Sequence, residues 1–198
     1  MKRASLFLVV CFAFAAVSTC ADAAKNNNKG KNVTTEKIMV IETSFGSIEI
    51  KFYPNKAPKH VEAIQKLTGE GFYNGTTFHR VIPGFMIQGG DPNSKSQNRA
   101  MHGMGGPGFT IPAEFNDVPH KRGVCSMARS QNPNSAGSQF FICVASNPSV
   151  SGLDRQYTVW GECIKGMEVA DAIVAVKRDQ NDNPLQRIEM KVSLKDVK

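Results

Sequence analysis

The sequence predicts a mainly β domain over residues 38–198, folded as a sandwich or a closed barrel. Short apolar or alternating segments recur about eight times, and glycine-rich turns separate them. Two segments alone have helical periodicity, and the strands do not alternate regularly with helices as they do in a parallel α/β sheet. Many short strands with few helices therefore favour an all-antiparallel architecture.

The domain opens with two predicted strands, KIMVIET and SIEIKFY, joined by SFGS, which suits a hairpin. In the second strand Ile48, Ile50 and Phe52 alternate with Glu49 and Lys51. This period of two predicts one buried and one exposed face.

Two helices are predicted, at 58–69 and at about 167–176. The first has Val61, Ile64 and Leu67 at helical spacing, between a proline that can occupy a first helical turn and a glycine that can end the helix. On the second helix, the predicted buried stripe consists of Val169, Ala172, Ile173 and Val176. The remaining strands are TFHRVI, FMIQGG, GVCSMA, QFFICVA, YTVWGECI and EMKVSLKDV.

Alternation within three of these strands predicts a candidate site. In TFHRVI, Arg80 shares a face with Phe78 and Ile82, whereas His79 and Val81 point the other way, toward the interior. In FMIQGG, Met86 shares a face with Gln88, and Phe85 with Ile87. In QFFICVA, Phe140, Ile142 and Val144 form the interior face, opposite Gln139 and Phe141.

If these strands are neighbours, one face gathers one charge, two amides and two large apolar groups, namely Arg80, Met86, Gln88, Gln139 and Phe141. An apolar pocket with a few polar groups is typical of a small-ligand or peptide site. The alternative is a solvated arginine beside ordinary core residues.

Other chemistries have weaker support. His79 is expected to be a packed, hydrogen-bonded histidine, because no nucleophile motif such as G-x-S-x-G occurs. The four histidines and five cysteines show no metal-ligand spacing, and GMGGPG at 103–108 matches no phosphate-binding loop. Cys125, Cys143 and Cys163 read as small buried hydrophobic residues, although the sequence leaves one disulfide among them open.

The amino terminus predicts export. Lys2 and Arg3 precede an apolar run at residues 6–17, which is shorter than the roughly 20 residues of a membrane-spanning helix. Ala-Asp-Ala at 21–23 fits a cleavage site with small residues, so residues 1–23 are expected to be a signal peptide.

Two alternatives are an uncleaved anchor and, for the exported protein, a lipoprotein acylated at Cys20. Once exported, the protein is expected at a membrane only if Cys20 is lipidated. Residues 24–37 are polar and rich in Asn and Lys, which predicts a flexible tether. The net charge of +7 lies partly in this tether, so we expect no nucleic-acid partner.

Five motifs, in their order and spacing, resemble the cyclophilin family over nearly all of residues 38–198: FHRVIPGFMIQGGD, GGPGFTIPAEF, SMARS, GSQFFI and LDRQYTVWGE. The resemblance implies a closed eight-stranded antiparallel β-barrel capped by two α-helices. It also implies peptidyl-prolyl cis–trans isomerase activity without a cofactor. The expected partners are proline-containing peptides and unfolded or folding proteins, and the expected state is a monomer.

The resemblance assigns Arg80 as the catalytic residue. The substrate-binding positions that it implies are Phe85, Met86, Gln88, Gly103, Ala128, Arg129, Gln139, Phe141, Leu153 and Tyr157. Gly152 stands where many eukaryotic members have a tryptophan that helps hold cyclosporin, and Tyr157 where they have a histidine. Weak inhibition by cyclosporin is therefore expected.

The motifs look bacterial in style, so we expect a periplasmic or secreted protein that assists folding. The eukaryotic secretory pathway is the alternative, in which the sequons at Asn32 and Asn74 would matter. Two rival functions are a proline-peptide binding module with incidental catalysis and a hydrolase that uses His79.

Overall fold

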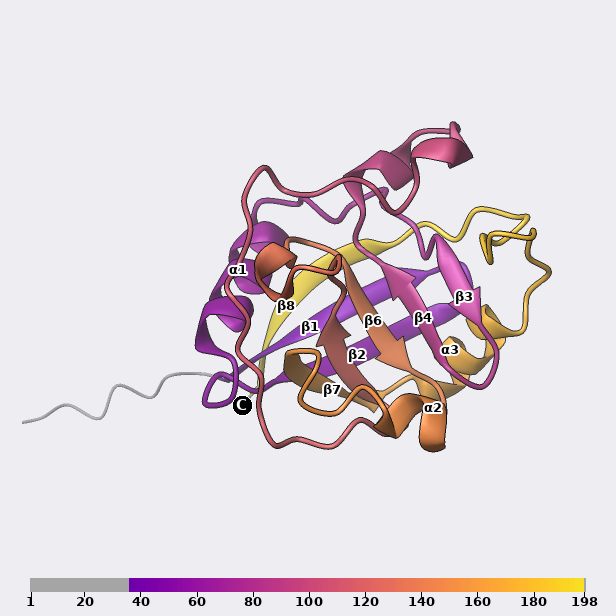
Figure 1. Ribbon diagram of the computed structural model, residues 1–198. Helices are drawn as coiled ribbons and strands as arrows, with labels where there is room; N and C mark the ends of the chain where they lie inside the picture. The colour runs from indigo at the N-terminus through magenta and orange to yellow at the C-terminus, as the bar shows by residue number, and fades with distance from the viewer. Residues whose placement is uncertain (1–35, 198) are drawn as a thin grey trace, which may run out of the picture. The chain divides into compact units, whose positions relative to one another are not determined.

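The computed structural model describes residues 36–197 (Figure 1). The predicted signal peptide, Cys20, Asn32 and most of the predicted tether lie outside these residues. The strand β1 already begins at Glu36, inside the stretch predicted as tether, because Glu36 and Lys37 pair with Val197 and Asp196.

Eight antiparallel strands form one sheet, which agrees with the predicted strand number. They are β1 (Glu36–Thr43), β2 (Gly46–Phe52), β3 (Arg80–Ile82), β4 (Met86–Gly89), β5 (Val124–Met127), β6 (Phe140–Cys143), β7 (Val159–Lys165) and β8 (Lys191–Val197). The hydrogen-bonded order is β3-β4-β6-β5-β7-β2-β1-β8.

The sheet is not closed by strand pairing, in contrast to the predicted barrel. The end strands β3 and β8 are not neighbours, and irregular segments before them are linked instead. The N–H of Gly75 donates to Met190 O (2.9 Å), that of Met190 to Thr76 O (2.8 Å) and that of Phe78 to Ile188 O (3.0 Å).

Two main helices lie on opposite sides of the sheet in Figure 1: α1 (Pro58–Gly69) and α3 (Met167–Val174). The bounds of α1 match the prediction, and its predicted stripe is buried. On α3 the predicted residues Val169 and Ile173 are buried, but the predicted Ala172 is exposed. The helix ends at Val174, and the predicted Val176 lies beyond it, half-buried against the core.

Four short helical segments were not predicted: the one-turn helix α2 (Pro148–Ser151) and the 3-10 turns η1 (Pro92–Lys95), η2 (Arg99–Met101) and η3 (Pro133–Ser135). Each follows an Asp or Asn whose side-chain oxygen accepts a backbone N–H, at Asp91, Asn98, Asn132 and Asn147. Such caps are a local signal for a helix start.

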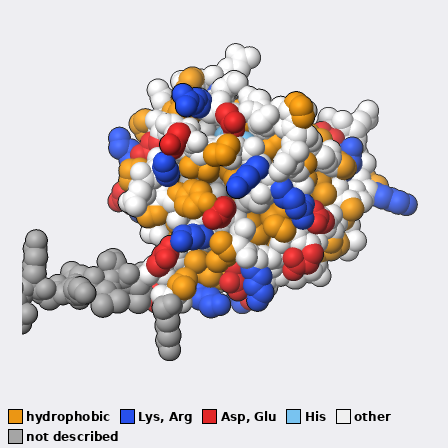
Figure 2. Space-filling view, turned by 90° about the horizontal axis from the view of Figure 1, so that it is seen from below, with side chains coloured by type: hydrophobic (Ala, Val, Ile, Leu, Met, Phe, Trp, Pro, Cys, Tyr) orange, Lys and Arg blue, Asp and Glu red, His pale blue; other side chains and the backbone are white. Residues whose placement is uncertain are grey.

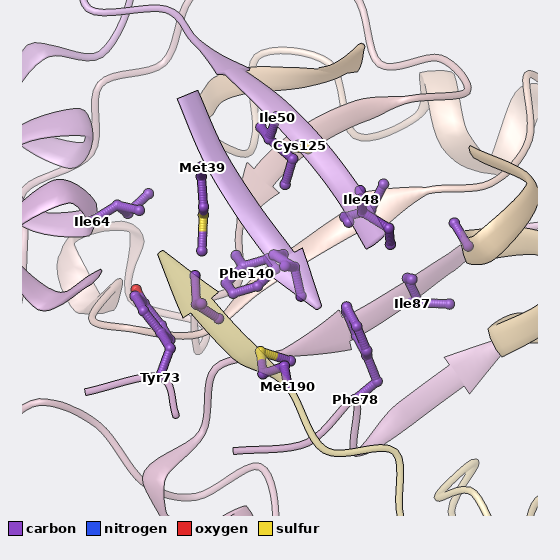
Figure 3. Packing of buried hydrophobic residues seen from close by; sticks show 14 of the residues in the cluster. Met39, Ile48, Ile50, Ile64, Tyr73, Phe78, Ile87, Cys125, Phe140 and Met190 are labelled. Atoms are coloured by element: carbon purple, nitrogen blue, oxygen red, sulfur yellow. The ribbon is translucent and has the colours of Figure 1, made fainter. Parts of the chain in front are cut away.

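The main core fills the interior of the curved sheet (Figure 3). The predicted inner residues Ile48, Ile50 and Phe52 of β2 and Phe140 and Ile142 of β6 all belong to it. The predicted alternation along β2 and β6 is therefore confirmed.

The thiols partly follow the prediction. Cys125 and Cys143 are fully buried, and Cys163 is half-buried with its Sγ 3.1 Å from Lys165 O. All three are free thiols. Within the described residues, no group of three or more His, Cys, Asp or Glu side chains could hold a metal ion, and no helix is long and apolar enough to cross a membrane.

Candidate active site

The candidate site is built on three adjacent strands. In the register, Arg80 of β3 lies opposite Gln88 of β4, and Gln88 lies opposite Phe141 of β6. Residues that face each other in neighbouring strands project to the same side of a sheet. The three side chains therefore share a face with Met86, as alternation predicted, and all four line one cavity of about 700 Å³.

Alternation failed for two residues that lie just outside these short strands. Phe78 was predicted on the face of Arg80, but it is buried in the main core, because β3 begins only at Arg80. Phe85 was predicted to share a face with Ile87, but it precedes β4 and packs with Met86 beside the cavity. The position of Phe85 in the cavity agrees with the assignment that rested on family resemblance.

An apolar floor lies under one part of the cavity. Met86, Phe141, Cys143 and Val150 form a small buried cluster, separate from the main core. Phe85, Ala128, Leu153 and Tyr157 pack against it and line the cavity as well. The ring of Tyr157 meets that of Phe141 edge-on at 5.7 Å between centroids. This floor offers the water-excluded surface that a proline ring needs.

Arg80 lines the same cavity as this floor, and one hydrogen bond holds its guanidinium. Its Nη1 donates to Gln88 Oε1 at 3.3 Å, and within residues 36–197 it makes no ion pair. A guanidinium has five N–H donors in a rigid plane. Most of the donors of Arg80 are therefore left for a bound ligand.

A chain of amides positions Gln88. Its Nε2 donates to Gln139 Oε1 (3.0 Å), and Gln139 Nε2 donates to Gly103 O (3.0 Å) and Gly105 O (2.9 Å). The buried Asp91 in turn accepts the N–H of Gly103. Gln139 therefore ties the loop at 103–105 to the residue that contacts Arg80.

Gln139 does not line the cavity that holds Arg80. It lines a neighbouring cavity of about 350 Å³, which also touches Gln88, Gly103, Ala128 and Arg129. The other ten residues assigned to the site line the first cavity. The structure thus brings together the whole predicted set around two adjoining hollows.

Comparison with known proteins identifies the family. A family model described as cyclophilin type peptidyl-prolyl cis-trans isomerase matches residues 38–193. The chain belongs to the cyclophilin family. This cyclophilin is therefore a peptidyl-prolyl cis–trans isomerase.

Similar sequences carry the same activity in their names. A probable peptidyl-prolyl cis-trans isomerase of Brucella abortus is 46% identical over 143 residues, which are 70% of this chain and 71% of the relative. A peptidyl-prolyl cis-trans isomerase of Synechococcus elongatus is 42% identical over 146 residues, 70% of this chain and 93% of the relative.

A solved structure is also similar. A cyclophilin-type isomerase of Cryptosporidium parvum, crystallised in the presence of the dipeptide Ala-Pro, matches with a TM-score of 0.70 and 30% sequence identity. The match covers 81% of this cyclophilin and 99% of the parasite chain.

His79 matches its expected state in part. It is 4% exposed, so the prediction of a packed histidine is confirmed, but neither ring nitrogen has a partner with normal hydrogen-bond geometry within the described residues. Burial lowers the pKa of His79 from 6.5 to about 4, although the nearby carboxylate of Asp91 and the backbone of Thr77 oppose this shift. The ring is therefore neutral at pH 7.

Sequence reasoning missed a Ser-His-Asp arrangement behind the floor. His120 Nδ1 lies 3.0 Å from Asp154 Oδ1, and His120 Nε2 lies 3.1 Å from Ser126 Oγ. This order resembles that of a serine hydrolase. However, Ser126 is fully buried and its hydroxyl donates to Thr158 O at 2.8 Å, so its oxygen is neither accessible nor activated.

The arrangement supports Phe141 instead. The ring of His120 stacks on that of Phe141 at 6.2 Å between centroids and 19° between planes. Burial lowers the pKa of His120, and Asp154 opposes this shift. No sequence motif marks these residues, since 34 positions separate His120 from Asp154.

Sequence reasoning also missed a polar wall of the main cavity. Arg99, Ala100 and His102 come from the loop around η2, and Asp179, Asn181 and Asn183 come from the loop between α3 and β8. The two loops meet through Arg99, whose Nη1 donates to Asn183 Oδ1 at 3.1 Å. This long-range contact leaves no local signal in the sequence.

Proposed function

We propose that Arg80 is the catalytic residue of this isomerase and that the apolar floor seats the substrate proline. Amide resonance restrains the X-Pro bond with a barrier of about 18–20 kcal/mol. In the twisted state the resonance is lost, and the prolyl nitrogen regains its lone pair. A donor that meets this nitrogen only in the twisted state lowers the barrier.

The observation that carries this proposal is that Arg80, Phe85, Met86 and Phe141 line one cavity, while the guanidinium of Arg80 makes a single hydrogen bond, to Gln88, within residues 36–197. Since no bond is cleaved, the reaction needs no nucleophile. Gln88 orients the guanidinium, and the amide chain through Gln139 fixes Gln88.

The peptide backbone is proposed to bind along Ala128 and Arg129. The N–H of Ala128 already donates to Gln139 O at 2.9 Å, so the carbonyl of Ala128 and the backbone of Arg129 take this role. The Arg129 side chain lies 4.6 Å from the centroid of the Tyr157 ring and donates to Gln156 O, which fixes the rim of the cavity.

The direct test is the catalytic efficiency of Arg80→Ala on a short Ala-Pro peptide, measured by NMR exchange. We expect a decrease of about tenfold or more, the range for loss of a transition-state donor. An unchanged melting temperature is expected as the folding control. Activity like that of the wild type in a folded variant would reject Arg80 as the catalytic residue.

A binding module with incidental catalysis is the rival function. The complete set around Arg80 argues against it, and the isomerase names of the relatives favour turnover. Tight binding of an X-Pro peptide without acceleration of its isomerisation would support this rival.

A hydrolase that uses His79 has no structural support. Within the described residues its ring contacts no hydroxyl or thiol by hydrogen bond. Intact peptides after long incubation would eliminate this function.

The biological setting is proposed as assistance to the folding of exported proteins by a monomer in the periplasm or outside the cell. Support comes from the basic start, short apolar run and Ala-Asp-Ala of residues 1–23. Uncatalysed prolyl isomerisation takes about 10–100 s, so an exported catalyst is useful. Mass spectrometry of the exported protein would reveal cleavage after Ala23, acylation at Cys20 or a glycan at Asn32.

Two further expectations are kept as proposals. The links between residues 75–78 and 188–190 support a barrel that is closed through irregular segments.

On the face seen in Figure 2, acidic and basic side chains are interspersed, which supports the absence of a nucleic-acid partner on that face.

A further inference from the structure

The residues that line the main cavity fall into two groups, which we call the apolar and the polar compartment. The apolar compartment is the floor described above. The polar compartment is lined by His79, Arg99, His102, Asp179, Asn181 and Asn183. The whole cavity, about 700 Å³, lies in the range of roughly 300–1,000 Å³ that holds drug-sized ligands. It therefore has room for more of the substrate than the proline ring.

Contacts between two loops fix the side chains of the polar compartment. Arg99 Nη2 donates to Leu185 O at 2.7 Å, and Nη1 lies 3.5 Å from Asp179 Oδ2. His102 is held at both ring nitrogens, by Asn183 Nδ2 (2.9 Å) and by Ser96 O (2.9 Å). Side chains fixed in this way are preorganised for binding.

The charges in the compartment favour an anion. Asp179 Oδ1 accepts the backbone N–H groups of Asn181 (2.9 Å) and Asn183 (3.0 Å), and Oδ2 faces Arg99. The one carboxylate of the lining is thus already satisfied. Arg80, which also lines the cavity, makes no ion pair within the described residues, whereas Arg129 lies over the Tyr157 ring beside the apolar floor. Two guanidinium groups, those of Arg80 and Arg99, therefore stand against one carboxylate in this part of the cavity.

His79 borders the cavity but does not contribute a hydrogen bond to it. Both ring nitrogens are inaccessible, and the backbone of Thr77 lies beside the ring. The polar groups that remain available to a ligand are therefore those of Arg80 and Arg99.

On the basis of the isomerase function proposed above, we propose that the polar compartment binds the side chain of a residue flanking the substrate proline and selects Glu or Asp over Lys or Arg. A carboxylate would accept hydrogen bonds from Arg80 and Arg99, whereas an ammonium group would lie beside two guanidinium groups. Since Arg99 is about one-third exposed, the expected preference is modest, about two- to fivefold in kcat/KM.

The test uses peptides with Glu, Gln or Lys placed directly before proline in one series and directly after it in another. In at least one series, kcat/KM is expected to decrease from Glu through Gln to Lys. The Glu-to-Lys ratio should approach one as salt rises from about 0.01 M to about 1 M, because the Debye length shrinks from about 30 Å to about 3 Å.

Two substitutions should change this ratio in opposite directions. Arg99→Gln removes a cation, so the preference for Glu should decrease by about half or more. Asp179→Asn removes the carboxylate, so the preference should increase. If the substitutions only disturbed the loops, the Glu-to-Lys ratio of kcat/KM would change in the same direction in both variants.

Arg178→Gln is the matched control. Arg178 lies in the same loop and pairs with Asp182 at 3.0 Å, but it does not line the cavity. The Glu-to-Lys ratio should stay at the wild-type value in this variant. A change as large as that in Arg99→Gln would overturn the assignment to the polar compartment.

An Ala-Pro reference peptide separates this inference from the proposed function. If the wild type does not accelerate this peptide, the proposed function itself fails. If the wild type turns over the reference peptide but gives equal rates for Glu, Gln and Lys in both series, the selectivity proposal is wrong while the isomerase mechanism stands.

Discussion

The two faces of strands β4 and β6 have different surroundings, although the residues of both faces alternate along the same backbone. On the inner face, the ring of Phe140 packs edge-on against Tyr73 (5.8 Å), Phe78 (6.4 Å) and Trp160 (5.9 Å). On the outer face, the ring of Phe141 lies between His120 (6.2 Å) and Tyr157 (5.7 Å). Phe140 is thus surrounded by other aromatic side chains. Phe141, in contrast, stacks on a histidine that belongs to a hydrogen-bonded polar network.

This difference shows how one strand pair serves both stability and chemistry. The inner face gains from close packing and burial alone. On the outer face, hydrogen bonds position Arg80 and support Phe141, while the cavity above stays open to a ligand. Neighbouring residues should therefore respond differently to substitution.

The largest expected effect is on stability. Phe140→Ala should lower the free energy of unfolding by about 3–5 kcal/mol, because it leaves a large cavity in the main core. Phe141→Ala, next to it in the chain, should cost less, because the space that it leaves opens into the main cavity, but should decrease catalytic efficiency more. Chemical denaturation combined with peptide kinetics measures both. Equal losses of stability would break the comparison between the two faces.

The next effect is the pH dependence that His79 gives to stability. Its pKa is about 4 in the folded protein and 6.5 as the reference value, so the folded state binds fewer protons between these values. The stabilisation is complete above pH 6.5 and is lost as the pH falls toward 4. The expected loss is about 2–3 kcal/mol.

Denaturation of the wild type and of His79→Gln at several pH values tests this effect. The free energy of unfolding should depend less steeply on pH in the variant between pH 6.5 and 4. His60 and His120, whose pKa values are also lowered by burial, remain in both proteins and cancel in the difference. Parallel curves would show that His79 is not desolvated.

A smaller effect is expected for the amide chain. Gln88→Leu removes the hydrogen bond to Arg80 and the link to Gln139, so kcat/KM should decrease about fivefold, which corresponds to about 1 kcal/mol. Gln65→Leu, on α1 and distant from both cavities, is the control with the same chemical change. If both variants keep wild-type activity, Gln88 does not position Arg80.

The sequence predicted the parts of the fold that depend on local pattern. The bounds of α1 and the buried faces of β2 and β6 follow directly from periodicity and from Pro58 and Gly69. Prediction failed at Phe78 and Phe85, because β3 and β4 have only 3 and 4 residues and these rings lie beyond their ends. Alternation gives no information where the strand has ended.

The site was predictable to the extent that its residues form recognisable motifs. Alternation grouped Arg80, Met86, Gln88 and Phe141, and the family resemblance added the other members of the floor. The polar wall and the network of His120 were missed because tertiary contacts create them. Arg99 and Asn183, for example, are 84 positions apart.

The central claim is that Arg80 acts on the twisted state of the X-Pro bond and not on ground-state binding. The most direct measurement is kcat and KM of Arg80→Ala determined separately, by NMR exchange over a range of peptide concentrations. The account predicts that kcat decreases about tenfold or more while KM changes by no more than about threefold. An increase in KM with unchanged kcat would contradict it, because Arg80 would then only bind the peptide.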